Sequence, residues 1–321
     1  MDYVVLDLEW NQASDNRDAR SSRLLTFEII EIGAVKLNSR MEIIDTFQEL
    51  ICPQVYEEMH SVTERLIGIH MEELQGKRKF TEVAGDFLKW CGTDFMFGTW
   101  GPQDLTELQR NMRFFGMEPL GTGPVRFYDI QKLFSIAYEN QKSRRSLEYA
   151  VDFLNIEKDG AFHRALSDAW YTARVLQMIK DPVALQRFSY DTFVLPKSHR
   201  DEVHVVFDDY AKYISRPFAD KEELMADREV ISTRCYLCHK NLRRKVRWFT
   251  PNGRHYYSLS YCDKHGWMKG KIRIKKAEND MVYAVKTTKF ISEEEREQIL
   301  GRKEHVRELR REHRHRGWDK K

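Results

Sequence analysis

The first 180 residues alternate between short apolar runs and segments whose apolar residues lie three or four positions apart. Runs rich in valine, isoleucine and phenylalanine predict buried strands over residues 3–8, 27–37, 42–51, 94–98 and 126–130. The wider spacing predicts helices over residues 81–91, 104–115, 146–154 and 164–179. Strands first follow one another and then alternate with helices, which predicts an α/β domain with a mixed central sheet flanked by helices.

The pattern changes after Asp181-Pro182, where a proline ends the last of these helices. Residues 186–228 are mixed in character, and we expect a partly helical linker there. Residues 229–290 are basic, rich in predicted strands and contain three cysteines, which indicates a small β module. Residues 291–321 open with the capping-box pattern Ser292-Glu293-Glu294-Glu295 and predict a basic C-terminal helix. The first domain then covers residues 1–185.

Composition narrows the class of protein. In 321 residues, 41% are hydrophobic and 12% aromatic, which excludes a disordered chain. No apolar run approaches the roughly 18 residues of a membrane helix. The N-terminal stretch MDYVVLDLEW has acidic residues and no basic segment, so it does not resemble a signal peptide. We therefore expect a cytoplasmic protein that contacts no membrane, and its protein partners are unknown.

Charge is distributed unevenly. Residues 1–190 carry 22 Lys and Arg against 29 Asp and Glu, whereas residues 191–321 carry 31 against 21. An acidic first half beside a basic second half favours a cation-binding site joined to a module that contacts polyanions. Ordinary solvated faces of mixed charge are the competing interpretation.

The first predicted strand ends in Asp7-Leu8-Glu9. Because side chains alternate along a strand, Asp7 and Glu9 point the same way and Leu8 points into the core. Two carboxylates about 7 Å apart on one face repel each other unless cations lie between them, and hard divalent ions prefer oxygen ligands. A strand end fraying into solvent would also tolerate two acids.

Further along the chain, Asp104 is predicted to open a helix, where an N-cap is its more common role. His163 and Asp168 follow at the start of the last helix. Five residues of helix turn two side chains roughly 140° apart, so they can share a site only if His163 lies in the turn before the helix.

This constellation resembles the DEDDh branch of the DEDD superfamily of 3′–5′ exonucleases, which includes RNase T and oligoribonuclease. The stretches DLEWN and FEIIEIGAVKL are most similar to the Eri-like and KapD-like group, and the resemblance covers residues 1–182. The chain departs from that group at Gly101-Pro102-Gln103-Asp104, where Asp-Tyr-Asp is common. It departs again at Leu66-Ile67-Gly68-Ile69, where the group has Leu-Thr-Gly-Ile.

The resemblance implies an RNase H-like fold and a metal-dependent 3′–5′ exonuclease acting on single-stranded RNA or DNA 3′ ends, with RNA favoured, to give nucleoside 5′-monophosphates. It further implies that His163 accepts the proton of the attacking water. Trp10 could stack on a terminal base or pack in the core. The alternative is a regulatory or adaptor protein that keeps the fold without turnover. The resemblance implies that two Mg²⁺ or Mn²⁺ are held by Asp7, Glu9, Asp104 and Asp168, and that substrate is contacted by Leu8, Trp10 and Ile67.

Cysteines mark a second candidate metal site. Cys235 and Cys238 form one CxxC knuckle, and Cys262 and His265 form another with the same spacing. Four such ligands fit one structural Zn²⁺ in a zinc-ribbon-like module, with an Asn-Gly hairpin between the knuckles. The motif Cys235-x-x-Cys238-His239 also matches haem attachment, and a redox CxxC is a third interpretation.

Beside these ligands, cations alternate with apolar residues along one predicted strand. Lys271, Arg273 and Lys275 would share a face, with aromatic residues at Trp248, Tyr256 and Tyr257 nearby. Cations for phosphates and aromatic rings for bases are typical of single-strand binding, so residues 229–290 are predicted to bind nucleic acid. A zinc-stabilised fold with an ordinary solvated face remains the alternative.

Overall fold

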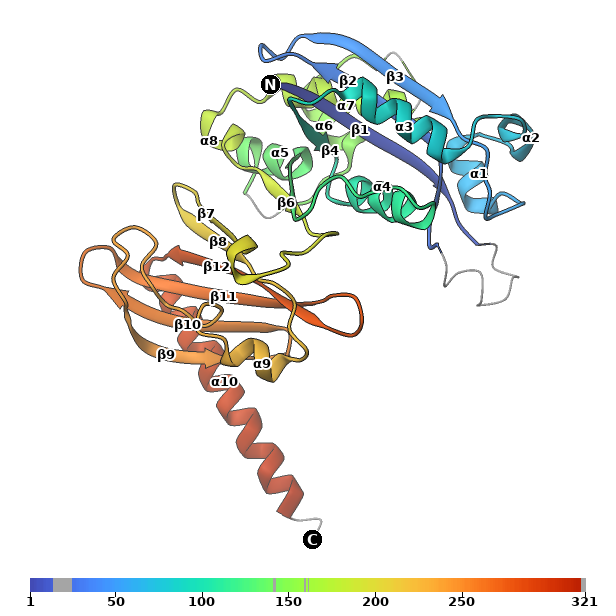
Figure 1. Ribbon diagram of the computed structural model, residues 1–321. Coiled ribbons are helices and arrows are strands. Elements are labelled where there is room, and N and C mark those ends of the chain that lie inside the picture. Colours follow the sequence, from blue (N-terminus) through green and yellow to red (C-terminus); the bar gives the residue numbers. More distant parts are fainter. Residues whose placement is uncertain (14–24, 141–142, 159, 161, 319–321) are drawn as a thin grey trace. The chain divides into compact units, whose positions relative to one another are not determined.

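The computed structural model describes residues 1–13, 25–140, 143–158, 160 and 162–318. Contacts within the chain divide it into two units, Met1–Val194 and Leu195–Lys321. Each unit has its own sheet, and the colours of Figure 1 run from blue and green in the first to yellow and red in the second. The first unit therefore extends past the predicted end at residue 185.

A six-stranded sheet with the order β3-β2-β1-β4-β5-β6 forms the centre of the first unit. β1 pairs antiparallel with β2 and parallel with β4, and β6 pairs antiparallel with β5. The predicted mixed sheet is thus confirmed. Its strands are β1 (Asp2–Asn11), β2 (Glu28–Leu37), β3 (Ile43–Leu50), β4 (Phe95–Thr99), β5 (Val125–Asp129) and β6 (Ser189–Asp191).

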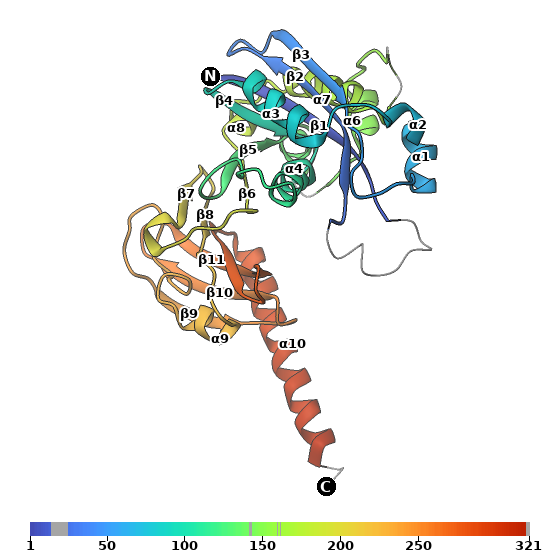
Figure 2. The same ribbon diagram turned by 45° about the vertical axis from the view of Figure 1, so that its right-hand side comes forward.

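Helices cover both faces of this sheet (Figures 1 and 2). Val4, Leu6 and Leu8 of β1 pack with α3 and α4, whereas Val5 packs with α5, α6 and α7 on the other face. Asp7 and Glu9 alternate with the first set and so share the face of α7. The helices of this unit are α1 (Ser61–Ile67), α2 (Met71–Leu74), α3 (Phe80–Cys91), α4 (Gln103–Phe114), α5 (Ile130–Tyr138), α6 (Leu147–Phe153), α7 (Ala165–Met178) and α8 (Pro182–Leu185).

The second unit contains an antiparallel sheet with the order β7-β8-β12-β11-β10-β9. Phe218, Leu224 and Val230 pack on one face against Ile272 and Ala284. Ile299 of the last helix packs on the other face. The elements are β7 (Val203–Val206), β8 (Tyr210–Ile214), α9 (Lys221–Ala226), β9 (Arg243–Phe249), β10 (His255–Cys262), β11 (Gly266–Lys276), β12 (Val282–Phe290) and α10 (Glu293–Trp318), with one 3₁₀ turn at His199–Asp201.

The structure differs from the predicted linker over residues 186–228. This segment supplies β6 to the first sheet, and β7, β8 and α9 to the second unit. These strands have three to five residues each. β6 and β8 pair with distant strands, β5 and β12, whereas β7 pairs with the adjacent β8. Strands this short carry no clear local period, because their conformation depends on pairing with other strands.

The predicted C-terminal helix is present as α10, and its first turn is capped because the Ser292 Oγ accepts the Glu295 N–H at 3.3 Å. Its apolar residue Ile299 is buried against Val246 and Leu259. Within the described residues, no helix combines the length and the apolar character needed to cross a membrane.

Gly33 of β2 permits an unusually close approach between the first sheet and α7. A Cβ at this position would lie 2.1 Å from the backbone of both Ala165 and Leu166. Gly33 is also the partner of Asp7 across the β1–β2 pair. The start of α7 can therefore lie directly against the strand pair that carries the first carboxylates, which only a residue without a side chain allows.

We predict that Gly33→Ala destabilises the first unit by about 1–3 kcal/mol, the range for side chains forced into a packed interior. The matched control is Gly85→Ala in the middle of α3, where an added Cβ meets no atom within 4 Å. That change should be stabilising by about 0.5–1 kcal/mol, because alanine favours the helix over glycine. Urea unfolding of both variants makes the comparison; a Gly33→Ala protein as stable as the wild type would contradict the close approach.

Candidate functional site

The central strand β1 carries the first two acidic residues of the site. Asp7 and Glu9 lie on its α7 side, opposite Gly33 and Glu31 of β2. A shift of register between Glu9 and Trp10 marks a β-bulge directly after the pair. Such bulges redirect a strand, so the strand changes course just beyond the two carboxylates. The predicted common face of Asp7 and Glu9 is present.

Two further aspartates come from the first turns of helices. Asp104 lies in the first turn of α4 and is 6% exposed, and Asp168 lies in the first turn of α7. Ligand atoms of Asp7, Glu9 and Asp168 all lie within 4.8 Å of one another. Asp104 lies outside that group of three, but its charge acts on Asp7 more strongly than the charge of Glu9 does.

His163 lies in the turn before α7, as its spacing from Asp168 requires. Its backbone has a φ of 66°, in the left-handed region that few residues other than glycine adopt. The His163 N–H donates to Asp168 Oδ2 at 3.3 Å, which ties the turn to the helix. His163 is exposed.

The electrostatics of the group favour bound cations. Burial and then the neighbouring charges of Asp104, Glu9 and Asp168 raise the pKa of Asp7 well above its usual range. Burial raises the pKa of Glu9 to about 8, that of Asp104 to about 7 and that of Asp168 to about 6. Each carboxylate therefore holds a proton more readily than usual, as expected when like charges share a partly dehydrated space.

Asp168 also has an unpaired oxygen. Its Oδ1 is buried and has no hydrogen-bond partner among the described residues. A buried carboxylate oxygen without a donor is rare in folded proteins and suggests a missing ligand. Oxygen donors with raised pKa values and an orphaned buried oxygen together fit hard divalent cations such as Mg²⁺ or Mn²⁺.

A fifth carboxylate, Glu31, was not predicted. It is fully buried in β2, opposite Glu9, and accepts hydrogen bonds from Arg164 and Gln48. The only signal in the sequence is a glutamate inside the apolar run FEIIEIGAVKL. A charged residue in a buried strand requires a partner, but the sequence does not say that the partner is Arg164, 133 residues away.

The family profile that matches this chain is RNase_T, described as Exonuclease, and it covers residues 4–176. The chain belongs to this exonuclease family. Human and mouse 3'-5' exoribonuclease 1 are each 25% identical to it over 171 residues, which is 50% of this chain. The match covers 48% of the human protein and 49% of the mouse protein, so the chain spans about half the length of these relatives.

A solved structure supports the same fold. The nuclease domain of 3'hExo, described as a DEDDh family member bound to rAMP, aligns with a TM-score of 0.50 and 22% identity. The alignment covers 60% of this chain and 96% of that domain. The RNase H-like fold expected from the resemblance is thus confirmed, and the exonuclease-family match over residues 4–176 bears out the resemblance itself.

Of the three side chains predicted to contact substrate, two are buried in the exonuclease unit. Leu8 is 3% and Ile67 5% exposed, so neither presents an exposed side chain to a ligand. Trp10 is half-buried and packs on Phe27, with ring centroids 5.4 Å apart. Trp10 thus takes part in the core, while its exposed part leaves base stacking open.

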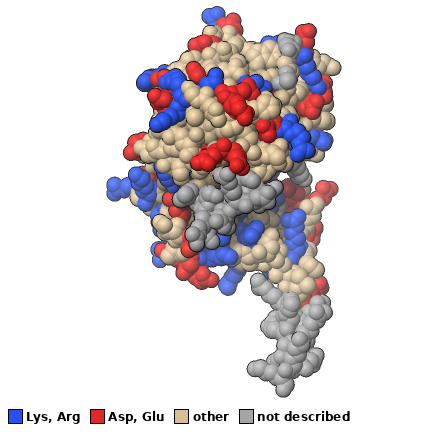
Figure 3. Space-filling model, turned by 90° about the vertical axis from the view of Figure 1, so that its right-hand side faces the viewer, with Lys and Arg blue, Asp and Glu red and all other residues tan. Residues whose placement is uncertain are grey.

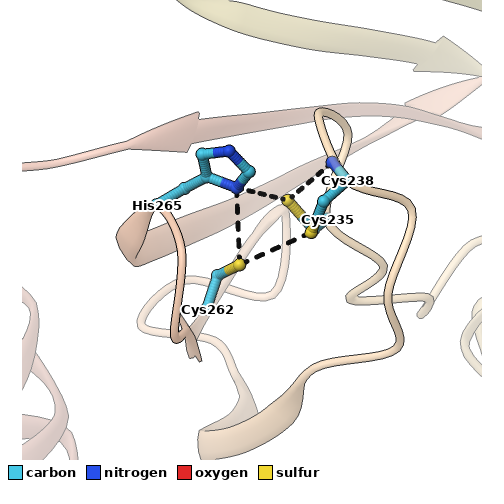
Figure 4. A group of neighbouring side chains, drawn as sticks. All are labelled: Cys235, Cys238, Cys262 and His265. Carbon is cyan, nitrogen blue, oxygen red and sulfur yellow. Dashed lines mark hydrogen bonds between the residues drawn. The ribbon is translucent and has the colours of Figure 1, made fainter.

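The exonuclease-family match ends before the cysteines, which form a second group in the other unit. Cys235, Cys238, Cys262 and His265 offer ligand atoms that all lie within 4.8 Å of one another (Figure 4). His265 Nδ1 lies 3.4 Å from the sulfurs of Cys235 and Cys262, and the sulfurs of Cys238 and Cys262 are 3.6 Å apart. Tetrahedral zinc with bonds of about 2.3 Å would separate two sulfurs by about 3.8 Å. The predicted four residues do converge, at spacings that fit one zinc ion.

One face of the molecule shows how charged side chains are distributed. In the space-filling view, basic and acidic side chains are interspersed over the upper part of the molecule (Figure 3). The negative balance of the first half therefore does not form one continuous acidic surface on the face in view. Part of that balance is instead buried, at Glu28, Glu31, Asp104 and Glu107.

We predict that the protein loses stability in a chelator as the pH rises from about 5 to 8. Unfolded carboxyl groups titrate near pH 4, whereas those of Asp168, Asp104 and Glu9 titrate at about 6, 7 and 8 in the folded chain. The folded state thus binds more protons over this window, and its stability falls as they leave.

Thermal unfolding between pH 5 and 8 in EDTA measures this effect. Asp104→Asn should flatten the decline, because it removes one titrating group and lowers the repulsion on Asp7. An EDTA-treated wild type whose melting temperature stays level or rises across the window would be inconsistent with the raised pKa values.

Proposed function

We propose that the protein is a metal-dependent 3′–5′ exonuclease that removes nucleoside 5′-monophosphates from single-stranded nucleic acid. The observation that carries this proposal is the convergence of Asp7, Glu9 and Asp168, with Asp104 close enough to act on Asp7. RNA is favoured over DNA because the relatives of known name are exoribonucleases. The rival function is a regulatory or adaptor protein that has kept the fold.

Each residue has a distinct role in this proposal. Asp7, Glu9, Asp104 and Asp168 hold two Mg²⁺ or Mn²⁺ through their carboxylate oxygens. When bound, such ions neutralise the phosphate and favour both the attacking and the leaving oxygen. The His163 imidazole accepts the proton of the attacking water, a role that suits its exposed position beside the carboxylates. Trp10 would contact the terminal nucleotide through the exposed part of its ring, whereas the burial of Leu8 and Ile67 argues against direct contact by their side chains.

Degradation of 5′-labelled single-stranded RNA and DNA with Mn²⁺ or EDTA tests the activity. We predict stepwise shortening from the 3′ end with Mn²⁺ and none with EDTA. Asp7→Asn should lower the rate by more than about 100-fold, the upper end for residues that only support a ligand. Asp2→Asn, at the start of the same strand, is the control and should leave the rate unchanged. A near wild-type rate for Asp7→Asn at saturating Mn²⁺ would favour the rival function.

We further propose that Cys235, Cys238, Cys262 and His265 bind one structural Zn²⁺. Cys262 ends β10 and His265 precedes β11, so one knuckle lies at the turn of a strand pair. The other knuckle closes through the His239 N–H, which donates to the Cys235 carbonyl at 2.9 Å. All four ligand positions come from the chain, so the ion has no open site and serves the fold.

We predict one zinc per chain in freshly purified protein. Cys238→Ser should release it and make residues 229–290 sensitive to protease, because metal binding is coupled to the folding of small modules. Cys52→Ser, which changes a half-buried cysteine of the first unit, should keep the zinc. Elemental analysis and limited proteolysis give both readouts. Protein that contains no zinc without exposure to chelator would remove this assignment.

The same unit carries a cationic sheet face, defined here by Lys271, Arg273 and Lys275 of β11. Lys271 and Arg273 are exposed, and Tyr257 and His255 of β10 stand opposite them. Burial lowers the pKa of Lys271, and so do the charges of Lys269, Arg273 and Arg302. Lys271 and Arg273 have no ion pair among the described residues, whereas Lys269 pairs with Glu295. We propose that phosphates of a single strand neutralise this face.

The double variant Lys271→Glu/Arg273→Glu should weaken binding of single-stranded RNA and reduce its salt dependence. Each lost phosphate contact lowers the slope of log K against log salt by about 0.7, so the pair should lower it by about 1.4. Lys221→Glu/Lys276→Glu changes the net charge equally, on α9 and on the opposite face of β11, and is the control. Fluorescence anisotropy in EDTA, where no hydrolysis occurs, measures both. If both double variants change RNA affinity and its salt dependence equally, the face of Lys271 and Arg273 is an ordinary solvated surface and the binding proposal fails.

A further inference from the structure

Glu31 is a buried carboxylate that the proposed metal ligands do not include. It is 0% exposed, and its oxygens are fully engaged by donors from two distant segments. Arg164 donates from Nη2 to Oε1 at 2.9 Å and from Nε to Oε2 at 3.1 Å. Gln48 Nε2 donates to Oε1 at 2.8 Å, and the Ala165 N–H donates to Oε2 at 3.3 Å. No oxygen of Glu31 is left for a cation, although its Cα partner is Glu9.

These contacts hold the one turn of the chain that bears His163. Arg164 is the N-cap residue of α7, and Ala165 is the first residue of that helix. The two-point hydrogen bond between a guanidinium and a carboxylate fixes both distance and orientation, which one hydrogen bond cannot do. The Ala165 N–H also belongs to the positive end of the helix, where a carboxylate is favoured. Glu31 thus fixes the start of α7 to β2.

His163 needs such support because its backbone is in an unfavourable conformation. A φ of 66° for a residue other than glycine persists only where the surrounding structure enforces it. On the helix side, the His163 N–H donates to Asp168. On the sheet side, the neighbouring Arg164 is fixed by Glu31. The turn is therefore tied at both ends. The sheet-side tie makes no hydrogen bond to a proposed metal ligand, although the charge of Arg164 also acts on Glu9.

We propose that Glu31 and Arg164 are positioning residues that hold the His163 turn so that its imidazole faces the attacking water. The proposal rests on the proposed exonuclease function. It predicts different consequences for His163 and Asp168 when the Glu31–Arg164 hydrogen bonds are lost. Asp168 belongs to a helix whose Ala169, Tyr171 and Ala173 are buried in the core, so it keeps its place when the Glu31–Arg164 hydrogen bonds are lost. His163 lies outside the helix and is exposed, so its position depends on those hydrogen bonds.

A double-mutant cycle on the full chain with Mn²⁺ tests this inference. Arg164→Gln should lower kcat by at least about 10-fold, and by no more than the roughly 10²–10⁴-fold that a general base contributes. KM should stay unchanged, and Mn²⁺ affinity should be unchanged or higher, because the lost positive charge acts on Glu9. In a His163→Ala background, Arg164→Gln should cause no further loss, because both changes act through the same imidazole. Arg164→Lys should fall between wild type and Arg164→Gln, since lysine keeps the charge and loses the fork. Arg174→Gln, on the same helix with its guanidinium over Trp170, is the control expected to leave kcat unchanged.

Multiplicative losses in the cycle would overturn the proposal, because Arg164 would then act on substrate or metal independently of His163. A loss of Mn²⁺ affinity, or an unchanged kcat, would overturn it as well. If Arg164→Gln does not fold, the neutral pair Glu31→Gln/Arg164→Gln replaces it in the cycle with the same expectation, because it leaves no unpaired buried charge. A wild-type protein that hydrolyses nothing would instead refute the proposed function, so the two failures are distinguishable.

Discussion

The strongest constraint on this structure is the repulsion among carboxylates that lie in one partly dehydrated space. Ligand atoms of Asp7, Glu9 and Asp168 lie within 4.8 Å of one another, and the charge of Asp104, in the first turn of α4, acts on Asp7. Burial raises the pKa of every one of the four. A chain folds this way against an electrostatic penalty, and that penalty becomes useful only when cations enter and relieve it. The carboxylate group therefore does not stabilise the fold by itself, and its arrangement is explained by cation binding.

The fold tolerates this group through features that lower its self-repulsion. Asp104 and Asp168 both occupy first turns of helices, where backbone N–H groups and the helix dipole favour negative charge. Gly33 lets the start of α7 approach β2, so Asp168 can reach the central strand. Arg164 neutralises Glu31, the one carboxylate with no free oxygen for an ion. Rigid helix and strand ends thus hold the acids, as accurate metal coordination requires.

Sequence patterns predicted the acidic residues of the site but not the residues and strands that position them. Alternation along β1 predicted the common face of Asp7 and Glu9, and the spacing of His163 and Asp168 required a turn followed by a helix. Both signals are local, as is the knuckle spacing of the cysteines. The role of Gly33 depends on a helix backbone 132 residues later in the chain. β6 and β8 were missed for the same reason, because their conformation depends on pairing with the distant strands β5 and β12.

Calorimetric titration of Mn²⁺ into the metal-free protein, in two buffers of different ionisation enthalpy, tests the central claim most directly. If the carboxylates hold protons until cations replace them, binding near pH 6 must release protons to the buffer. The account predicts two Mn²⁺ per chain at this site, with proton release that shrinks toward pH 9 as Glu9, Asp104 and Asp168 ionise on their own. Binding without proton release at pH 6, or no binding at the carboxylates, would contradict it.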